Sequence, residues 1–72
     1  MFKLYNRLGD GRLLYREAWV AGTRIIEHWG ECGDRGQTQE HPYSGNTLQR
    51  LQEDARAAGY QPIPEDDMTI LV

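Results

Sequence analysis

The sequence has one cysteine, one lysine and no long apolar run. With Cys32 alone, no disulfide can form within the chain, whereas a secreted protein of 72 residues normally relies on several. No segment approaches the roughly 18 to 20 apolar residues that span a bilayer, and no charged and apolar leader follows Met1. These absences exclude a disulfide scaffold and predict a cytoplasmic protein that does not enter a membrane.

Length and apolar content are low as well. A chain of 72 residues, 39% of them hydrophobic, forms one small core, because so short a chain buries only about 60% of the surface that it exposes when unfolded. Ordering it costs on the order of 100 kcal/mol, at about 1.5 kcal/mol per residue. We expect a single domain over residues 1–72, and the narrow stability margin favours a homodimer or attachment to a partner.

Positive charge is scarce. The net charge of −3 disfavours non-specific nucleic-acid binding, in which lysine and arginine displace counterions from phosphates. Residues 1–36 carry six basic and five acidic side chains, and residues 37–72 carry two basic and six acidic ones. Seven of the eight basic residues are arginine, the side chain suited to phosphate, carboxylate and aromatic partners. The composition predicts a molecule with two electrostatically different sides.

Turn signals divide the first half of the chain into segments with strand character. Apolar and polar residues alternate in the first segment, and β-branched and aromatic residues fill the third. The second places Leu13, Tyr15 and Trp19 on one side and Leu14, Ala18 and Val20 on the other. We predict an antiparallel meander of four segments, residues 2–8, 13–21, 23–31 and 37–41.

The turns between these segments are built from glycine. Asp10–Gly11 predicts a primed hairpin turn, in which both central residues take positive φ. Ala21–Gly22 predicts the next reversal, which would make Arg16 and Arg24 neighbours across a hairpin. Gly33 to Gly36 repeats the same chemistry before the fourth segment.

After residue 46 the period changes to that of a helix. Leu48, Leu51, Ala55 and Ala58 form one apolar stripe on a helix from about Thr47 to Ala58. Asn46 is placed as its N-cap with Gln49 as the reciprocal residue, and Gly59 is placed for the left-handed residue that ends a helix.

The last residues, "EDDMTILV", join a solvated acidic stretch to a segment of strand composition. Met68–Val72 is either a fifth strand or an apolar end that awaits a partner. The sequence thus predicts an α+β fold, an antiparallel four- or five-stranded sheet with one helix packed on one face.

Residues 29–37, "WGECGDRGQ", resemble the signature of the WGR domain, named for Trp-Gly-Arg and continuing through a glycine and a short turn to Gly-Gln. The context agrees, because that family has strands before and after the motif and a helix that crosses the sheet. The resemblance covers roughly Phe2 to Tyr60. WGR domains occur beside the catalytic region of DNA-dependent ADP-ribose polymerases and as stand-alone proteins in bacteria, so the resemblance implies a bacterial binding module of this fold.

The resemblance also implies a site. In the polymerases the motif tryptophan packs against the sugar at a DNA end, and the motif arginine adds polar contacts. The tryptophan corresponds to Trp29 and the glycine to Gly30, but the arginine position holds Glu31. A carboxylate repels phosphate where a guanidinium would pair with it.

We predict a nucleic-acid site in which an indole stacks and arginines contact phosphates, made of Trp29, Gly30, Arg16, Arg24 and Arg35. Each residue type has a structural alternative. Trp29 would cap the core by packing on Leu48 or Leu51, the arginines would form exposed pairs with Glu17, Glu27 and Asp34, and the glycines would shape a bulge and a tight turn.

The histidines and the cysteine do not predict chemistry. The separations of His28, Cys32 and His41, 4 and 9 residues, fit no common zinc pattern, and residues 28 and 32 of one strand lie about 13 Å apart, too far for a Cys-His pair. We expect no metal, no cofactor and no enzymatic activity.

Two function hypotheses follow from the sequence. One is a module that binds DNA ends, and the other is a protein-interaction module in which Glu31 and the acidic half engage a basic partner.

Overall fold

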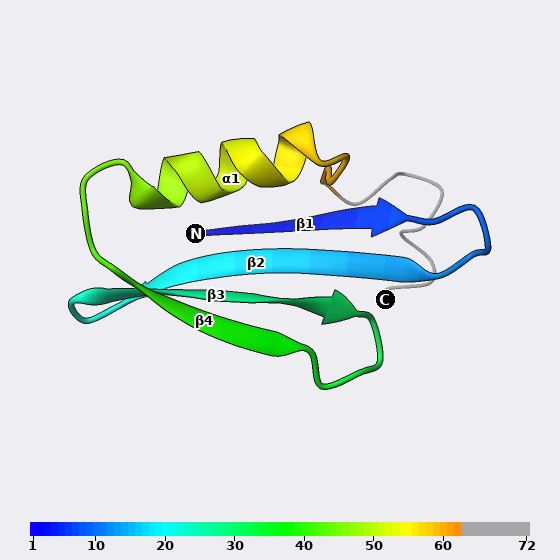
Figure 1. Ribbon diagram of the computed structural model, residues 1–72, viewed down its shortest axis with the longest axis horizontal. Coiled ribbons are helices and arrows are strands. Elements are labelled where there is room, and N and C mark those ends of the chain that lie inside the picture. Colours follow the sequence, from blue (N-terminus) through cyan, green and yellow to red (C-terminus); the bar gives the residue numbers. More distant parts are fainter. Residues whose placement is uncertain (63–72) are drawn as a thin grey trace.

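The computed structural model describes residues 1–62 as one sheet and one helix (Figure 1). The antiparallel sheet has the order β1-β2-β3-β4, and its strands are β1 (Phe2–Arg7), β2 (Leu13–Ala21), β3 (Arg24–Glu31) and β4 (Gln37–Pro42). Helix α1 (Thr47–Ala57) follows β4 and packs mainly on β2 and β1. The predicted α+β fold is confirmed, while the alternatives for Met68–Val72 concern a segment outside the described residues.

A two-residue loop sets the register of β2 on β3. Ala21 pairs with Arg24 across Gly22 and Thr23, and Gly22 has φ 64°, as the first position of a type II′ turn requires. The pairing continues in step to Leu14 opposite Glu31. Since side chains alternate between the two faces, this register decides which residues of β2 and β3 share a face.

The main core lies between the sheet and α1. Its buried residues come from three strands and the helix: Phe2, Leu4, Ala18, Ile25 and Ala55. Leu48 and Leu51 pack against it, which confirms the predicted stripe, although Ala58 is exposed. The opposite face of the sheet has a second buried cluster, Tyr5, Leu13 and Tyr15, and Trp19 lies partly exposed on that same face.

Among the described residues, Ile25 is the largest side chain that is fully buried. We expect Ile25→Val to lower the free energy of unfolding by about 0.5–1.5 kcal/mol, because it removes one methylene from a packed site. Urea denaturation with an unchanged m-value measures this loss. Ile26→Val is the matched control, since Ile26 is partly exposed on the other face; an equal or larger loss there would contradict the position of the core.

The turn between β1 and β2 differs from its prediction. Positive φ in the described residues occurs only at glycines, so Gly11 has φ 93° and Asp10 has no positive φ. Leu8 accepts a bond from the Gly11 amide at 3.0 Å, and the Asp10 carboxylate accepts bonds from the Arg12 amide at 3.1 Å and its Nε at 2.9 Å. The primed turn is therefore wrong: the aspartate closes the turn as an acceptor while Gly11 takes the left-handed conformation.

The C-terminal end of α1 follows its prediction. Gly59 has φ 98°, its amide donates to Arg56 O at 3.0 Å, and the Tyr60 amide donates to Ala55 O at 3.0 Å. This is the Schellman arrangement that a left-handed glycine permits. The chain then returns to β1, where Tyr5 and Gln61 exchange backbone bonds of 2.7 and 2.8 Å.

The predicted N-cap position of α1 is confirmed at Asn46, but the predicted capping hydrogen bonds are absent from the described residues. Asn46 occupies the N-cap position, but its side chain makes no capping hydrogen bond. The Ser44 hydroxyl donates to Asn46 Oδ1 at 3.3 Å and also bonds the Thr47 hydroxyl. Gln49 donates to Glu53 at 3.1 Å instead of reaching back to Asn46. Both residues of the expected capping box, Asn46 and Gln49, thus form hydrogen bonds with other side chains, Ser44 and Glu53.

Candidate binding surface

Arg16 and Trp29 are direct cross-strand partners on the face of the sheet that carries α1. They share this face with the core residues Ala18 and Ile25, because each lies an even number of positions away from one of them. Both side chains are partly exposed. The sheet therefore places a guanidinium beside an indole at the end of β3 that leads into the glycine-rich loop.

The guanidinium of Arg16 has no anionic partner within residues 1–62. Its Cζ lies 5.0 Å from the ring centroid of Tyr60, a cation–π contact. Its Nε is buried and has no hydrogen-bond partner, and no ion pair of the described residues involves Arg16. A buried donor left unpaired costs about 1–3 kcal/mol. The charge of Arg16 is thus unpaired among the described residues, while its Nε is shielded from solvent.

Trp29 is not among the apolar side chains of the described residues that pack directly on the helix-side core. The partly buried apolar residues packed on that core in the described part of the chain are Leu48, Leu51 and Tyr60. Along β3 the indole has a carboxylate two positions away on each side, Glu27 and Glu31, on the same face. Trp29 is thus a partly exposed ring between two acidic residues, with one arginine across from it.

Gly30 and Gly36 are required by close packing of the loop between β3 and β4. A Cβ on Gly30 would lie 2.8 Å from Gly36 Cα. A Cβ on Gly36, whose φ is 76°, would lie 2.6 Å from the Trp29 carbonyl oxygen and collide with the Tyr15 hydroxyl. Gly33, with φ 99°, has open space around it. The glycines shape the loop, as the structural alternative held, and Gly30 has this steric role beside Trp29.

The remaining arginines of the predicted site lie apart. Arg24 pairs with Ala21 and Pro42, five residues or about 16 Å along β3 from Trp29 and on the opposite face. The expectation that Arg16 and Arg24 are neighbours is wrong, because the two-residue loop sets a different register. Arg35 is exposed in the loop at the Trp29 end. The structure brings together Trp29, Gly30 and Arg16 and leaves Arg24 outside, while the Arg35 backbone is bonded to His28 on the opposite face.

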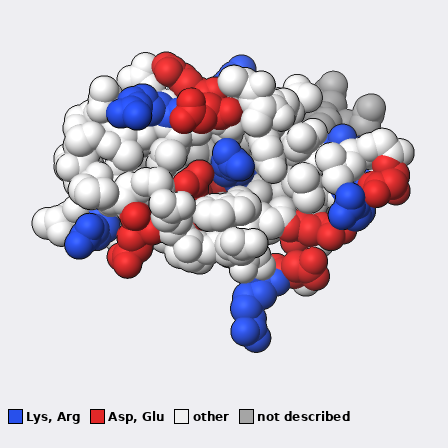
Figure 2. Space-filling view, viewed as in Figure 1, with Lys and Arg blue, Asp and Glu red and all other residues white. Residues whose placement is uncertain are grey.

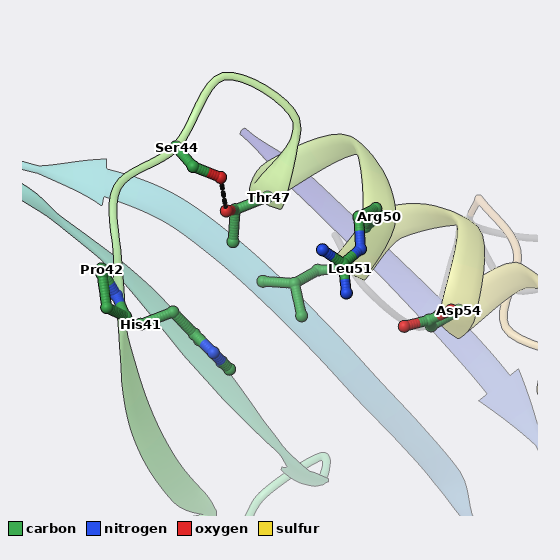
Figure 3. Close-up of a pocket in the computed structure, with 7 residues that line it drawn as sticks. All are labelled: His41, Pro42, Ser44, Thr47, Arg50, Leu51 and Asp54. Atoms are coloured by element: carbon green, nitrogen blue, oxygen red, sulfur yellow. Dashed lines mark hydrogen bonds between the residues drawn. The ribbon is translucent and has the colours of Figure 1, made fainter.

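A groove of about 500 Å³ lies between α1 and the end of β4 (Figure 3). Figure 3 shows Leu51 reaching from α1 and His41 from β4 toward the space between these elements. Its charged rim is mixed, since Arg50 and Asp54 both line it. His41 pairs with Ile25 and Gln37 with Trp29, so groove and indole lie at opposite ends of β4.

Charge is mixed over the visible surface too. In Figure 2 blue and red side chains intermingle, and no broad patch of one sign covers the face shown. Glu65, Asp66 and Asp67 account for the whole net charge of −3, so residues 1–62 are formally neutral. Long-range attraction of a polyanion therefore has little basis in the described part of the protein.

Two histidine–glutamate pairs lie on the two faces of the sheet and were missed from the sequence. His28 Nδ1 donates to Glu17 Oε2 at 3.0 Å, and His41 Nε2 donates to Glu27 Oε1 at 2.9 Å. The expected pairing of Glu17 and Glu27 with arginines is therefore wrong. The sequence feature that could have predicted the His28–Glu17 pair is the two-residue loop at Gly22. This loop sets the register of β2 on β3, and that register places Glu17 opposite His28.

No protein-family model matches the chain, and neither a curated protein nor a solved structure matches it. The WGR resemblance therefore stays a prediction from residues 29–37 and the order of the elements. Within residues 1–62, no helix has the length and apolar character needed to cross a membrane.

Proposed function

We propose that this chain is a non-catalytic binding module that recognises a DNA strand end through Trp29 and Arg16. The observation that carries the proposal is the pairing of a partly exposed indole with a guanidinium that has no anionic partner in the described residues. A terminal nucleotide can bind to both groups, because its sugar or base can stack on the indole and its phosphate can accept hydrogen bonds from the guanidinium. The WGR resemblance supports the same assignment.

The formal neutrality of residues 1–62 argues for few phosphate contacts. Arg16 beside the indole and Arg35 in the loop after β3 are the cations that we expect to supply them. Each neutralised phosphate contributes about −0.7 to −0.9 to the slope of log K against log salt. We expect a total slope between about −1 and −2, much shallower than that of a protein with a basic surface.

Arg16→Gln should weaken binding to DNA with a single-stranded overhang by roughly 10- to 150-fold at low salt, because one charge-assisted bond worth about 1.5–3 kcal/mol is lost. The salt slope should become shallower by about one. Fluorescence anisotropy of labelled DNA at two salt concentrations measures both effects. Arg24→Gln is the matched control, with the same change in charge on the far end of the opposite face; equal losses in the two variants would mean that the protein responds only to net charge.

A protein-interaction module is the second candidate. The observation in its favour is that the partly exposed Glu31 lies two positions from Trp29 on the same face, which suits a basic segment with an apolar anchor, whereas Glu27 is buried and bonded to His41. Glu31→Arg separates the candidates. If the face binds phosphate, this variant binds DNA more tightly and with a steeper salt slope; if wild type and Glu31→Arg both fail to bind DNA at low salt, the protein-interaction candidate replaces the first.

A further inference from the structure

The face opposite α1 carries a cluster of hydrogen bonds around His28. Its Nδ1 lies 3.0 Å from Glu17 Oε2, and its Nε2 lies 2.9 Å from the carbonyl oxygen of Arg35 and 3.1 Å from Tyr15 Oη. The imidazole also contacts the Tyr15 ring, with 5.1 Å between ring centroids. The His28 and Glu17 side chains are only 24% and 25% exposed. The imidazole therefore bridges β2 and the β3–β4 loop.

The chemistry of these acceptors fixes the protonation of the ring. A carboxylate and a backbone carbonyl only accept, so each of these two bonds needs an N–H on the ring nitrogen that faces it. A neutral imidazole has one N–H and cannot make both bonds. We propose that His28 is an imidazolium that fastens the β3–β4 loop to β2, and that loss of its proton releases this loop. The latch belongs to the free protein and does not depend on the proposed function.

Loss of the proton changes the bonds that the ring can make. When His28 loses a proton, the N–H facing the Glu17 carboxylate is retained, because that bond has a charged acceptor. Nε2 then carries a lone pair in the plane of the ring, and the Tyr15 hydroxyl, 3.1 Å from Nε2 and 3.4 Å from Nδ1, lies over the ring face and does not replace the lost donor. The Arg35 carbonyl oxygen, 2.9 Å away, faces that lone pair and is repelled. The cluster thus has two arrangements, and only the charged one holds the loop.

The surrounding charges favour the imidazolium. The bond to Glu17, and after it the bond to the Arg35 carbonyl, raise the pKa of His28 above its ordinary value. Burial and the positive charge of Lys3 lower this pKa, but by less. Lys3 is the cross-strand partner of Glu17 on β1. Titratable or charged groups of the described residues near the cluster also include Tyr15 on β2, Cys32, Asp34 and Arg35 in the loop, and Glu40 on the same face of β4.

The direction of the pH dependence follows from this shift. A group whose pKa is higher in the folded protein stabilises it fully below the unfolded value, about 6.5 for histidine. That stabilisation is lost as the pH rises through the folded pKa. The loop should therefore be fastened in mildly acidic solution and released as the solution becomes alkaline.

NMR of the free protein from about pH 5 to about pH 9 tests the latch, because histidine titrates in this range. We expect both ring nitrogens of His28 to show protonated shifts at the acid end and its midpoint to lie above about 6.5. The amides of residues 34–36 should follow the same curve. A midpoint at or below that value, or loop amides that do not follow it, would overturn the proposal.

Two controls are built into the experiment. Glu17→Gln should move the midpoints of His28 and of the loop amides to lower pH together, since it removes the charged acceptor. His41→Gln, which changes the histidine bonded to Glu27 on the other face, should leave the curve of the loop amides unchanged, and a changed curve would contradict the assignment. No DNA is present, so failure of the latch and failure of the DNA-binding proposal are separate results.

Discussion

Trp29→Ala should weaken binding to a DNA strand end by roughly 5- to 150-fold, the equivalent of about 1–3 kcal/mol for one lost stacking contact. The fold should survive the change, because the indole is partly exposed and is not among the described residues packed on the helix-side core. Anisotropy with labelled overhang DNA measures the affinity, and circular dichroism of the same samples measures the fold.

Trp19→Ala is the matched control, because Trp19 is also partly exposed but lies on the face of the sheet opposite Trp29. It should leave the affinity within about twofold of wild type, a difference of less than about 0.5 kcal/mol. Trp29→Phe, which keeps a smaller aromatic ring, should fall between wild type and Trp29→Ala. If Trp29→Ala binds as well as wild type, the indole is not the contact and the proposed site is wrong.

Gly36→Ala should cause the largest loss of stability, about 2–5 kcal/mol. Part of the loss is the strain of a side chain at φ 76°, and part is the collision of the new Cβ with the Tyr15 hydroxyl and the Trp29 carbonyl oxygen. At about 0.05–0.15 kcal/mol per residue, this is a large share of the total stability of so small a domain. Urea denaturation measures the loss.

Gly33→Ala separates strain from collision. Gly33 has φ 99° in the same loop, but a Cβ there meets no atom within 4 Å. Its alanine variant should lose only the strain, about 1 kcal/mol. Equal losses at Gly33 and Gly36 would show that the loop does not pack against Tyr15 and Trp29 as described.

The elements could be predicted from the sequence wherever local chemistry determines them. The period-two and helical patterns gave the strands and α1 to within one residue at most ends, and Gly59 ends the helix because glycine tolerates the left-handed conformation. The cap at Asn46 could not be predicted in the same way. Its side-chain oxygen is taken by Ser44, two residues earlier, and only the loop conformation brings these groups together.

The candidate site could be predicted only in part, because its members come from different strands. The motif predicted Trp29 and Gly30. Arg16, the cross-strand neighbour of Trp29, follows only from the register between β2 and β3. Recognising the two-residue loop at Gly22 would have placed Arg16 opposite Trp29 and excluded Arg24. The cation–π contact with Tyr60 depends on the path of the chain after α1, which no local pattern determines.

The measurement that tests the central claim most directly compares two labelled DNA duplexes of the same sequence, one with open ends and one closed at both ends by hairpin loops. The account predicts that wild-type protein binds the open duplex at low salt, with a salt slope between about −1 and −2, and binds the closed duplex at least tenfold more weakly. Equal affinity for the two duplexes, or no binding to either at low salt, would contradict recognition of a strand end by Trp29 and Arg16.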